Sequence, residues 1–253
     1  MGLFDLLAPI LGAVDHVLET FVPGGLRLVG WGILSGWLTM LLYRRFSRQQ
    51  AIAEMKAAQK QLQDRIASFE GEFSQLMPMV KRAFALGFRQ LGLSIGPALL
   101  ATIPILFIVA WVATNFVYEA PPAGADLDVK VEPVAGALSW SASAIAAPEE
   151  SGWTIQWPAE GQTVTLSDGD APVLSLSNDE LHGVIHKRRG WNLLIGNPAG
   201  YLPPDQPTEV IRIDLPQTRY LPFGPDWMRG WMLVFFGAFL AASVAFKFLL
   251  KIE

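Results

Sequence analysis

Length, composition and charge first limit what this chain can be. It has 253 residues, of which 51% are hydrophobic and only 17% are charged, and its formal net charge is −4. Soluble globular domains average about 25% charged residues, so this composition favours a membrane protein. The chain has no cysteine, which excludes structural disulfides and thiolate metal sites.

Residues 1–25 are predicted to form an amphipathic helix at the membrane surface, because apolar side chains recur every three or four positions from Leu3 to Phe21. The acidic residues and the lack of a basic start exclude a secretory signal peptide. We expect Pro9 to bend this helix and Pro23-Gly24-Gly25 to end it. Two placements stay open: the helix lies on the outer leaflet, or it packs on the protein's own outer domain.

Three long apolar segments predict three transmembrane helices, over residues 26–44, 90–118 and 223–253, the last range with a short tail. A helix rises ~1.5 Å per residue and the hydrocarbon core is ~30 Å thick. The second segment is long enough to span this thickness. The other two are short and need flanking Trp, Tyr and Arg side chains at the interfaces.

Residues 45–89, between the first two spans, have a helical pattern with a narrow apolar seam. The seam positions follow a spacing of three and four: Ile52, Met55, Gln59, Leu62, Ile66, Phe69, Phe73 and Leu76. Both ends must return to one membrane face, so we predict a coiled-coil hairpin that turns near Glu70-Gly71, with Pro78 close to the lipid surface. The alternative is an amphipathic helix lying flat on the membrane.

Charge asymmetry predicts the orientation of the chain. Residues 44–89 contain nine Lys/Arg against four Asp/Glu, whereas residues 119–222 contain six against fourteen. The positive-inside rule then places the first loop in the cytosol, the second loop and the N-terminus outside, and the C-terminus in the cytosol. We expect a prokaryotic cytoplasmic (inner) membrane, with a periplasmic or extracellular second loop.

Residues 119–222 are predicted to form a small extracytoplasmic all-β domain. Short alternating runs lie between turn residues, which is typical of a β-sandwich. The six predicted strands are Leu127–Val131, Trp153–Trp157, Thr163–Leu166, Val173–Leu176, Gly183–His186 and Val210–Leu215.

Two sets of polar residues are candidates for function. The first set forms stripes on the membrane helices: Ser35, Thr39, Gln90, Ser94 and Thr102. Such stripes indicate either ordinary helix packing, which Gly32 and Gly36 also favour, or a hydrated groove that opens to the cytosol. The second set is basic and lies at the cytosolic junctions: Arg44, Arg45, Lys81, Arg82 and Arg89.

Catalytic chemistry is not predicted. His182 and His186 share one face of a predicted strand without an acidic cluster beside them, so we expect no metal site and no cofactor. Phosphate-binding loops and nucleophile motifs are absent from the sequence, and an enzyme is not expected. Lys187-Arg188-Arg189 is predicted to face solvent, lipid headgroups or an acidic partner.

The order of these elements resembles the YidC/Oxa/Alb membrane-insertase superfamily, above all its three-helix members, the archaeal YidC-like proteins and their endoplasmic-reticulum relatives. The resemblance rests on the basic end of the first span, Leu42-Tyr43-Arg44-Arg45, and on the junction Met77–Phe88 between hairpin and second span. It covers residues 26–116 and, more weakly, residues 221–250.

The resemblance implies an insertase or membrane-protein chaperone with a cytosol-open polar groove between its three helices. Its partners would then be the lipid bilayer, nascent membrane proteins and the ribosome, whose RNA the basic residues could contact, but not DNA. Two alternatives stay open. One is a non-catalytic accessory or assembly subunit of a larger membrane complex, which would dock through the β domain or the hairpin. The other is a signalling protein.

Overall fold

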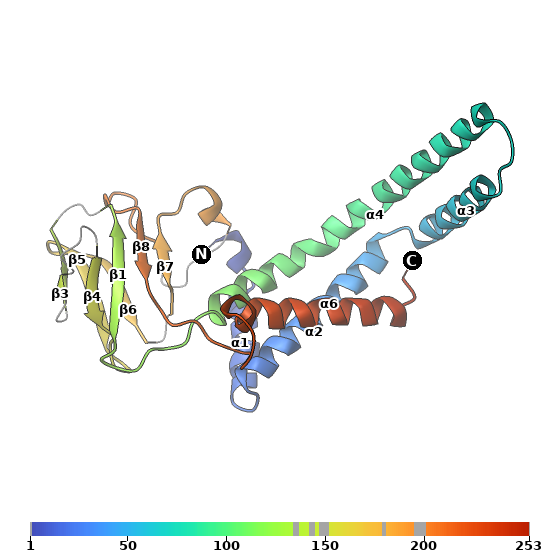
Figure 1. The fold of residues 1–253 in the computed structure, drawn as a ribbon. Helices are drawn as coiled ribbons and strands as arrows, with labels where there is room; N and C mark the ends of the chain where they lie inside the picture. Colours follow the sequence, from blue (N-terminus) through green and yellow to red (C-terminus); the bar gives the residue numbers. More distant parts are fainter. Residues whose placement is uncertain are drawn as a thin grey trace. The chain divides into compact units, whose positions relative to one another are not determined.

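The computed structural model describes residues 2–133, 137–141, 145–146, 152–178, 181–194 and 201–252. The chain forms two compact units, one made of residues 1–28 and 107–234 and the other of residues 29–106 and 235–253. Three helices are long and apolar enough to cross a membrane: α2 (Gly24–Phe46), α4 (Phe73–Asn115) and α6 (Trp231–Leu249). Each of them overlaps one of the three predicted apolar segments, although α4 begins well before residue 90 (Figure 1).

The N-terminal segment consists of a 3₁₀ turn, η1 (Leu3–Asp5), followed by helix α1 (Ala8–Glu19). The predicted bend at Pro9 is wrong, because Pro9 lies in the first turn of α1, where a missing backbone N–H costs nothing. The predicted helix end at Pro23-Gly24-Gly25 is also displaced, because α1 already ends at Glu19. Gly24 and Gly25 are the first residues of α2, and the Pro23 carbonyl accepts hydrogen bonds from the backbone N–H groups of Leu26 and Arg27.

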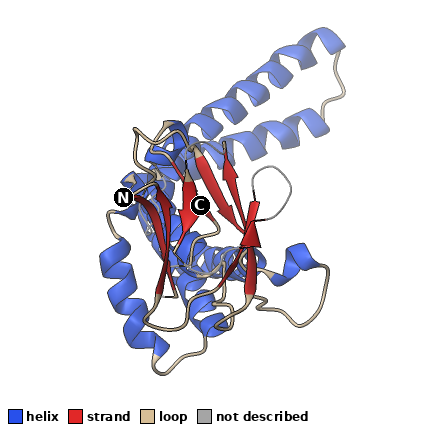
Figure 2. Ribbon diagram, turned by 90° about the vertical axis from the view of Figure 1, so that its left-hand side faces the viewer, coloured by secondary structure: helices blue, strands red, loops and turns tan. Residues whose placement is uncertain are grey.

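Two helices separated by a short turn follow α2. Helix α3 (Gln49–Ala67) ends where Ser68 donates a side-chain hydrogen bond to the Asp64 carbonyl at 3.0 Å. Helix α4 begins five residues further on, at Phe73, so the helical break includes the predicted turn at Glu70-Gly71. The first part of α4 runs beside α3 in both views (Figures 1 and 2).

Helix α4 is a single helix of 43 residues, although it contains Pro78, Pro97 and Pro104. The predicted boundary between hairpin and second span, at residues 89 and 90, is therefore not a helix boundary. Each proline removes one backbone hydrogen bond, and apolar helices tolerate this loss where neighbouring groups satisfy the freed carbonyl. The helix ends at Asn115, three residues before the predicted end of the span.

Helices α2 and α6 meet through glycine. A Cβ atom placed on Gly32 would lie 2.6 Å from the Phe235 carbonyl oxygen, and one on Gly36 would lie 2.7 Å from the Phe239 carbonyl oxygen. Side-chain atoms essentially never approach backbone oxygen this closely, so only glycine permits the contact. Gly32 and Gly36 therefore serve helix packing, which is one of the two interpretations that the sequence left open.

The β region contains two antiparallel sheets. The strand order is β3-β4-β1-β8-β7 in one sheet and β2-β5-β6 in the other. Six strands agree with the predicted ones: β1 (Asp126–Glu132), β4 (Gly152–Gln156), β5 (Thr163–Asp168), β6 (Ala171–Ser177), β7 (Val184–His186) and β8 (Val210–Ile213). Residues of both sheets share one hydrophobic core, and Figure 2 shows the strands in red.

This core forms because buried and exposed side chains alternate along the strands. In β1 the side chains of Leu127, Val129 and Val131 are buried while their neighbours are exposed. Gly169, with φ +59°, allows the tight turn between β5 and β6. Two further strands were not predicted, β2 (Leu138–Trp140) and β3 (Ile145–Ala146), because runs of three and two residues are too short to show a period of two.

The basic cluster in the β region is arranged differently from the prediction. Lys187 does not face solvent: it is 5% exposed, and its ammonium donates hydrogen bonds to the Gln206 carbonyl and to Glu209. Arg188 and Arg189 are exposed, as predicted. A short helix, α5 (Asp226–Arg229), then leads to α6.

We predict that Gly36→Ala weakens the contact between α2 and α6 and lowers the stability of the chain by about 1–3 kcal/mol, the usual cost of overpacking. Thermal unfolding of the detergent-solubilised chain measures the effect. The matched control is Gly30→Ala, because a Cβ at Gly30 has no neighbour within 4 Å. Equal melting temperatures for the two variants would contradict the glycine contact.

Candidate functional site

A groove of about 610 Å³ lies between α3 and the first part of α4 in the second unit. Its walls are uncharged. They consist of Gln59, Gln63 and Ile66 from α3 and of Val80, Ala83, Phe84, Gly87, Phe88, Gln90, Leu91 and Ser94 from α4. We call this feature the hairpin groove.

The α4 wall of the hairpin groove is aromatic and aliphatic. Phe84, Phe88 and Leu91 are spaced by four and three residues, and they are 66%, 71% and 54% exposed. Exposed apolar rows of this kind mark binding surfaces for other apolar groups. The sequence signal for this wall was the same three-and-four spacing that predicted the hairpin, but it does not distinguish a packed seam from an open one.

The α3 wall is mainly polar. Gln59 and Gln63 line the groove from α3, and a Cβ placed on Gly87 of the opposite helix would lie 3.8 Å from the Gln59 amide nitrogen, an ordinary contact. Two predicted seam positions, Gln59 and Ile66, therefore line an open space. The arms do not interdigitate along this length as knobs and holes would.

The structure brings only two of the five predicted groove residues into the hairpin groove, Gln90 and Ser94. Ser35 is fully buried on α2, and Thr39 donates a hydrogen bond to the Ser35 carbonyl at 2.8 Å. Thr102 is exposed and donates to the Ala98 carbonyl of its own helix at 2.8 Å. These three side chains do not line the hairpin groove.

The five predicted basic contacts are all exposed: Arg44, Arg45, Lys81, Arg82 and Arg89. None of the five lines the hairpin groove, although Lys81, Arg82 and Arg89 are sequence neighbours of lining residues on α4. The ion pairs between described residues include none of the five, so their charges are free to interact with solvent, headgroups or an anionic partner.

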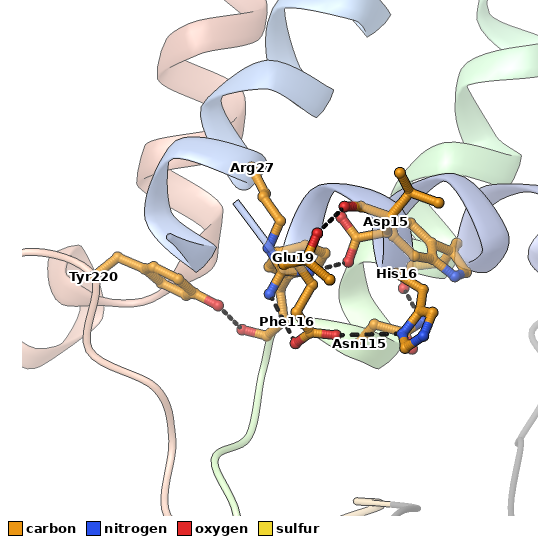
Figure 3. Close-up of polar contacts among 10 residues, drawn as sticks. Asp15, His16, Glu19, Arg27, Asn115, Phe116 and Tyr220 are labelled. Atoms are coloured by element: carbon orange, nitrogen blue, oxygen red, sulfur yellow. Dashed lines mark hydrogen bonds and ion pairs between the residues drawn. The ribbon is translucent and has the colours of Figure 1, made fainter. Parts of the chain in front are cut away.

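A second polar cluster lies in the first unit, around Arg27 (Figure 3). The guanidinium of Arg27 pairs with Asp15, and it also pairs with Glu19 at 3.2 Å. It lies 5.5 Å from the centroid of the Phe116 ring, a cation–π distance. The Arg27 and Asp15 side chains are only 12% and 11% exposed, so this pair is largely shielded from water.

The Arg27 cluster joins the ends of several elements. Tyr220 donates a hydrogen bond to the Phe116 carbonyl at 3.0 Å, as Figure 3 shows, and its ring lies against Gly24 and Gly25 at the start of α2. Burial raises the pKa of the Tyr118 phenol, with the Asp214 carboxylate as a smaller cause. The charges of Arg27, Asp15 and Glu19 pair with one another, which favours a structural role for the cluster.

The histidines of the β region show no sign of a metal site. Among the described residues, no group of three or more His, Asp or Glu side chains could hold a metal ion. Burial lowers the pKa of His182 to about 4. A neutral, desolvated imidazole is the expected state of a histidine packed in a core.

Comparison with known proteins finds no matching family model, no similar curated protein and no similar solved structure. The resemblance to the YidC/Oxa/Alb superfamily therefore stays a prediction.

We predict that the chain loses stability as the pH falls from about 6.5 to about 4. The unfolded chain protonates His182 in this range, whereas the folded chain keeps it neutral. Over the full range this difference is worth about 3 kcal/mol. Tryptophan fluorescence of the full chain during thermal unfolding, at several pH values, measures it.

His182→Gln should flatten this dependence, because the glutamine does not titrate. The matched change His16→Gln, at a side chain that is 84% exposed, should leave the dependence as in the wild type. A His182→Gln variant with the full wild-type dependence would contradict the assignment.

Proposed function

We propose that this chain is a membrane-protein insertase or chaperone that holds apolar segments of other proteins in the hairpin groove. The observation that supports the proposal is the groove itself. It is apolar on one wall, amide-bearing on the other, and it lies on a helix that continues directly into a membrane span.

The chemistry of the two walls suits an apolar segment that is not yet in lipid. Phe84, Phe88 and Leu91 offer apolar surface, and burying a phenylalanine side chain contributes ~1.5–3 kcal/mol. A segment outside the bilayer also exposes backbone groups that hydrocarbon cannot satisfy. Gln59, Gln63 and Gln90 offer donors and acceptors to such groups without bringing a net charge.

The continuity of α4 gives the held segment a path toward the bilayer. Ser94 lies at one end of the groove lining, and Leu99 and Ile103, further along α4, are 65% and 49% exposed. A client segment could therefore slide along one apolar helix face from groove to lipid. The free basic residues Lys81, Arg82 and Arg89 flank this path and favour anionic headgroups or ribosomal RNA.

This function places the hairpin in the cytosol of a prokaryotic cell, with α2, α4 and α6 in the cytoplasmic membrane and the β region outside. The charge asymmetry of the two loops supports that orientation. The same hairpin groove would also suit one fixed partner helix, as in an accessory or assembly subunit.

Photo-crosslinking in cells tests the proposal. A photo-reactive amino acid at Gln63 or Ser94, both in the groove lining, should crosslink to many newly made membrane proteins. The matched positions Gln61 and Ala85 are exposed on the same two helices but lie outside the lining, and should crosslink weakly. One or two stoichiometric partners would instead favour the accessory subunit and contradict the insertase.

We predict that Phe88→Gln lowers client crosslinking from Gln63 about tenfold, because one exposed aromatic contact is worth roughly 1.5 kcal/mol or more. Phe73→Gln is the matched control: Phe73 is 70% exposed and Phe88 is 71% exposed, but only Phe88 lines the groove. Equal crosslinking by both variants would show that clients do not contact the aromatic wall.

A further inference from the structure

The N-terminal segment has a row of apolar side chains on the outside and two of its three acidic side chains on the inside. Asp5 and Asp15 are each only 8% exposed. The exposed row consists of Leu3 52%, Leu6 64%, Ile10 63%, Val14 47%, Val17 63% and Phe21 82%. A surface helix of a soluble protein has the reverse arrangement, with its apolar stripe against the core.

Specific contacts fix this orientation. Asp15 is held by Arg27 of α2, in the ion pair described above. At the start of the segment, Asp5 accepts a hydrogen bond from the Gly2 backbone at 2.7 Å, and the Phe4 N–H donates to the Leu194 carbonyl at 2.8 Å. The Phe4 ring also packs edge-on against Phe107 at 5.4 Å. Rotation that buried the apolar row would break the shielded Asp15–Arg27 pair.

The smallest residue of the inner face allows α1 to lie close to the unit. A Cβ on Gly12 would be 3.9 Å from the Trp111 indole nitrogen, so the α1 backbone passes beside this ring. The two placements that the sequence left open, on the membrane surface and on the protein, therefore do not exclude each other, because they use different faces of α1. The polar and small face packs on the protein, and the apolar face has no cover within the described part of this unit.

The position of the helix identifies what covers that face. Helix α2, which is apolar enough to cross a membrane, begins at Gly24, five residues after α1 ends at Glu19. Phe21 and Leu26, at 82% and 63% exposed, continue the apolar row onto α2. The row itself contains no charged residue, so a charged protein partner finds no complementary charge within it.

We infer that α1 is an interfacial helix of the bilayer, at the membrane face where α2 begins. Its row from Leu3 to Phe21 lies among the acyl chains, and the Asp15–Arg27 pair lies on its protein side. Since the Phe4 N–H is bonded to the Leu194 carbonyl of the β region, the helix also ties that region to the lipid surface. This inference is independent of the proposed function.

Depth-dependent quenching tests the inference, and the lack of cysteine in the chain makes the labelling specific. Ile10→Cys and Val17→Cys, each carrying an environment-sensitive fluorophore, are compared with His16→Cys in the full chain. The protein is reconstituted in phosphatidylcholine vesicles with a spin label near the top of the acyl chains. An interfacial helix buries its apolar face to about that depth.

Lipid quenching at positions 10 and 17 should exceed that at position 16 by at least about twofold, with the reverse order for aqueous iodide. Equal quenching at all three positions would overturn the inference, because the helix would then lie in water. Protection of positions 10 and 17 from both quenchers would also overturn it, since a second copy of the chain or another protein would then cover the row.

Discussion

The backbone hydrogen bonding of α4 is the constraint on which the other elements depend. In hydrocarbon each backbone polar group needs a partner, and α4 stays a single helix over 43 residues although three prolines each remove one backbone hydrogen bond. Its first part forms one wall of the hairpin groove, its middle is apolar enough to span a bilayer, and its last residues belong to the unit that contains the β region. Because the helix is uninterrupted, the groove and the span share one surface.

The hairpin groove exists because the two helices present unlike side chains to each other. A regular seam of Leu and Ile would close by interdigitation and leave no cavity. Here α3 contributes Gln59 and Gln63, and α4 contributes Phe84 and Phe88 beside the small Gly87. Because packing a glutamine amide on a phenyl ring gains little free energy, the side chains of both walls stay accessible to solvent.

Sequence patterns predicted the elements that depend on neighbouring residues alone. The three apolar spans and six of the strands follow from mean hydropathy and from alternation, which short windows of sequence contain. The break near Glu70-Gly71 follows from the requirement that both ends of the loop return to one membrane face. Of the candidate site, Gln90 and Ser94 were predicted, whereas Phe84, Phe88 and Leu91 were not singled out as a binding wall.

The remaining features depend on contacts that no short window contains. Helix α4 continues through Pro78 from the hairpin into the apolar span, and no short window of sequence shows this continuity. Pro9 starts a helix instead of bending it, because the turn before it ends at Asp5. Lys187 is buried because Glu209, distant in sequence, faces it, and Ser35 is buried because Gly32 and Gly36 draw α6 onto the same face of α2.

The glycine contact between α2 and α6 has a consequence for biosynthesis. Helix α2 ends at Phe46, whereas its partner begins at Trp231, so the ribosome must complete the hairpin and the whole β region in between. At the usual rate of chain elongation this interval is on the order of ten seconds or more. During that time the glycine face of α2 lacks its α6 contact. The pairing of α2 with α6 therefore waits until the β region between them has been made.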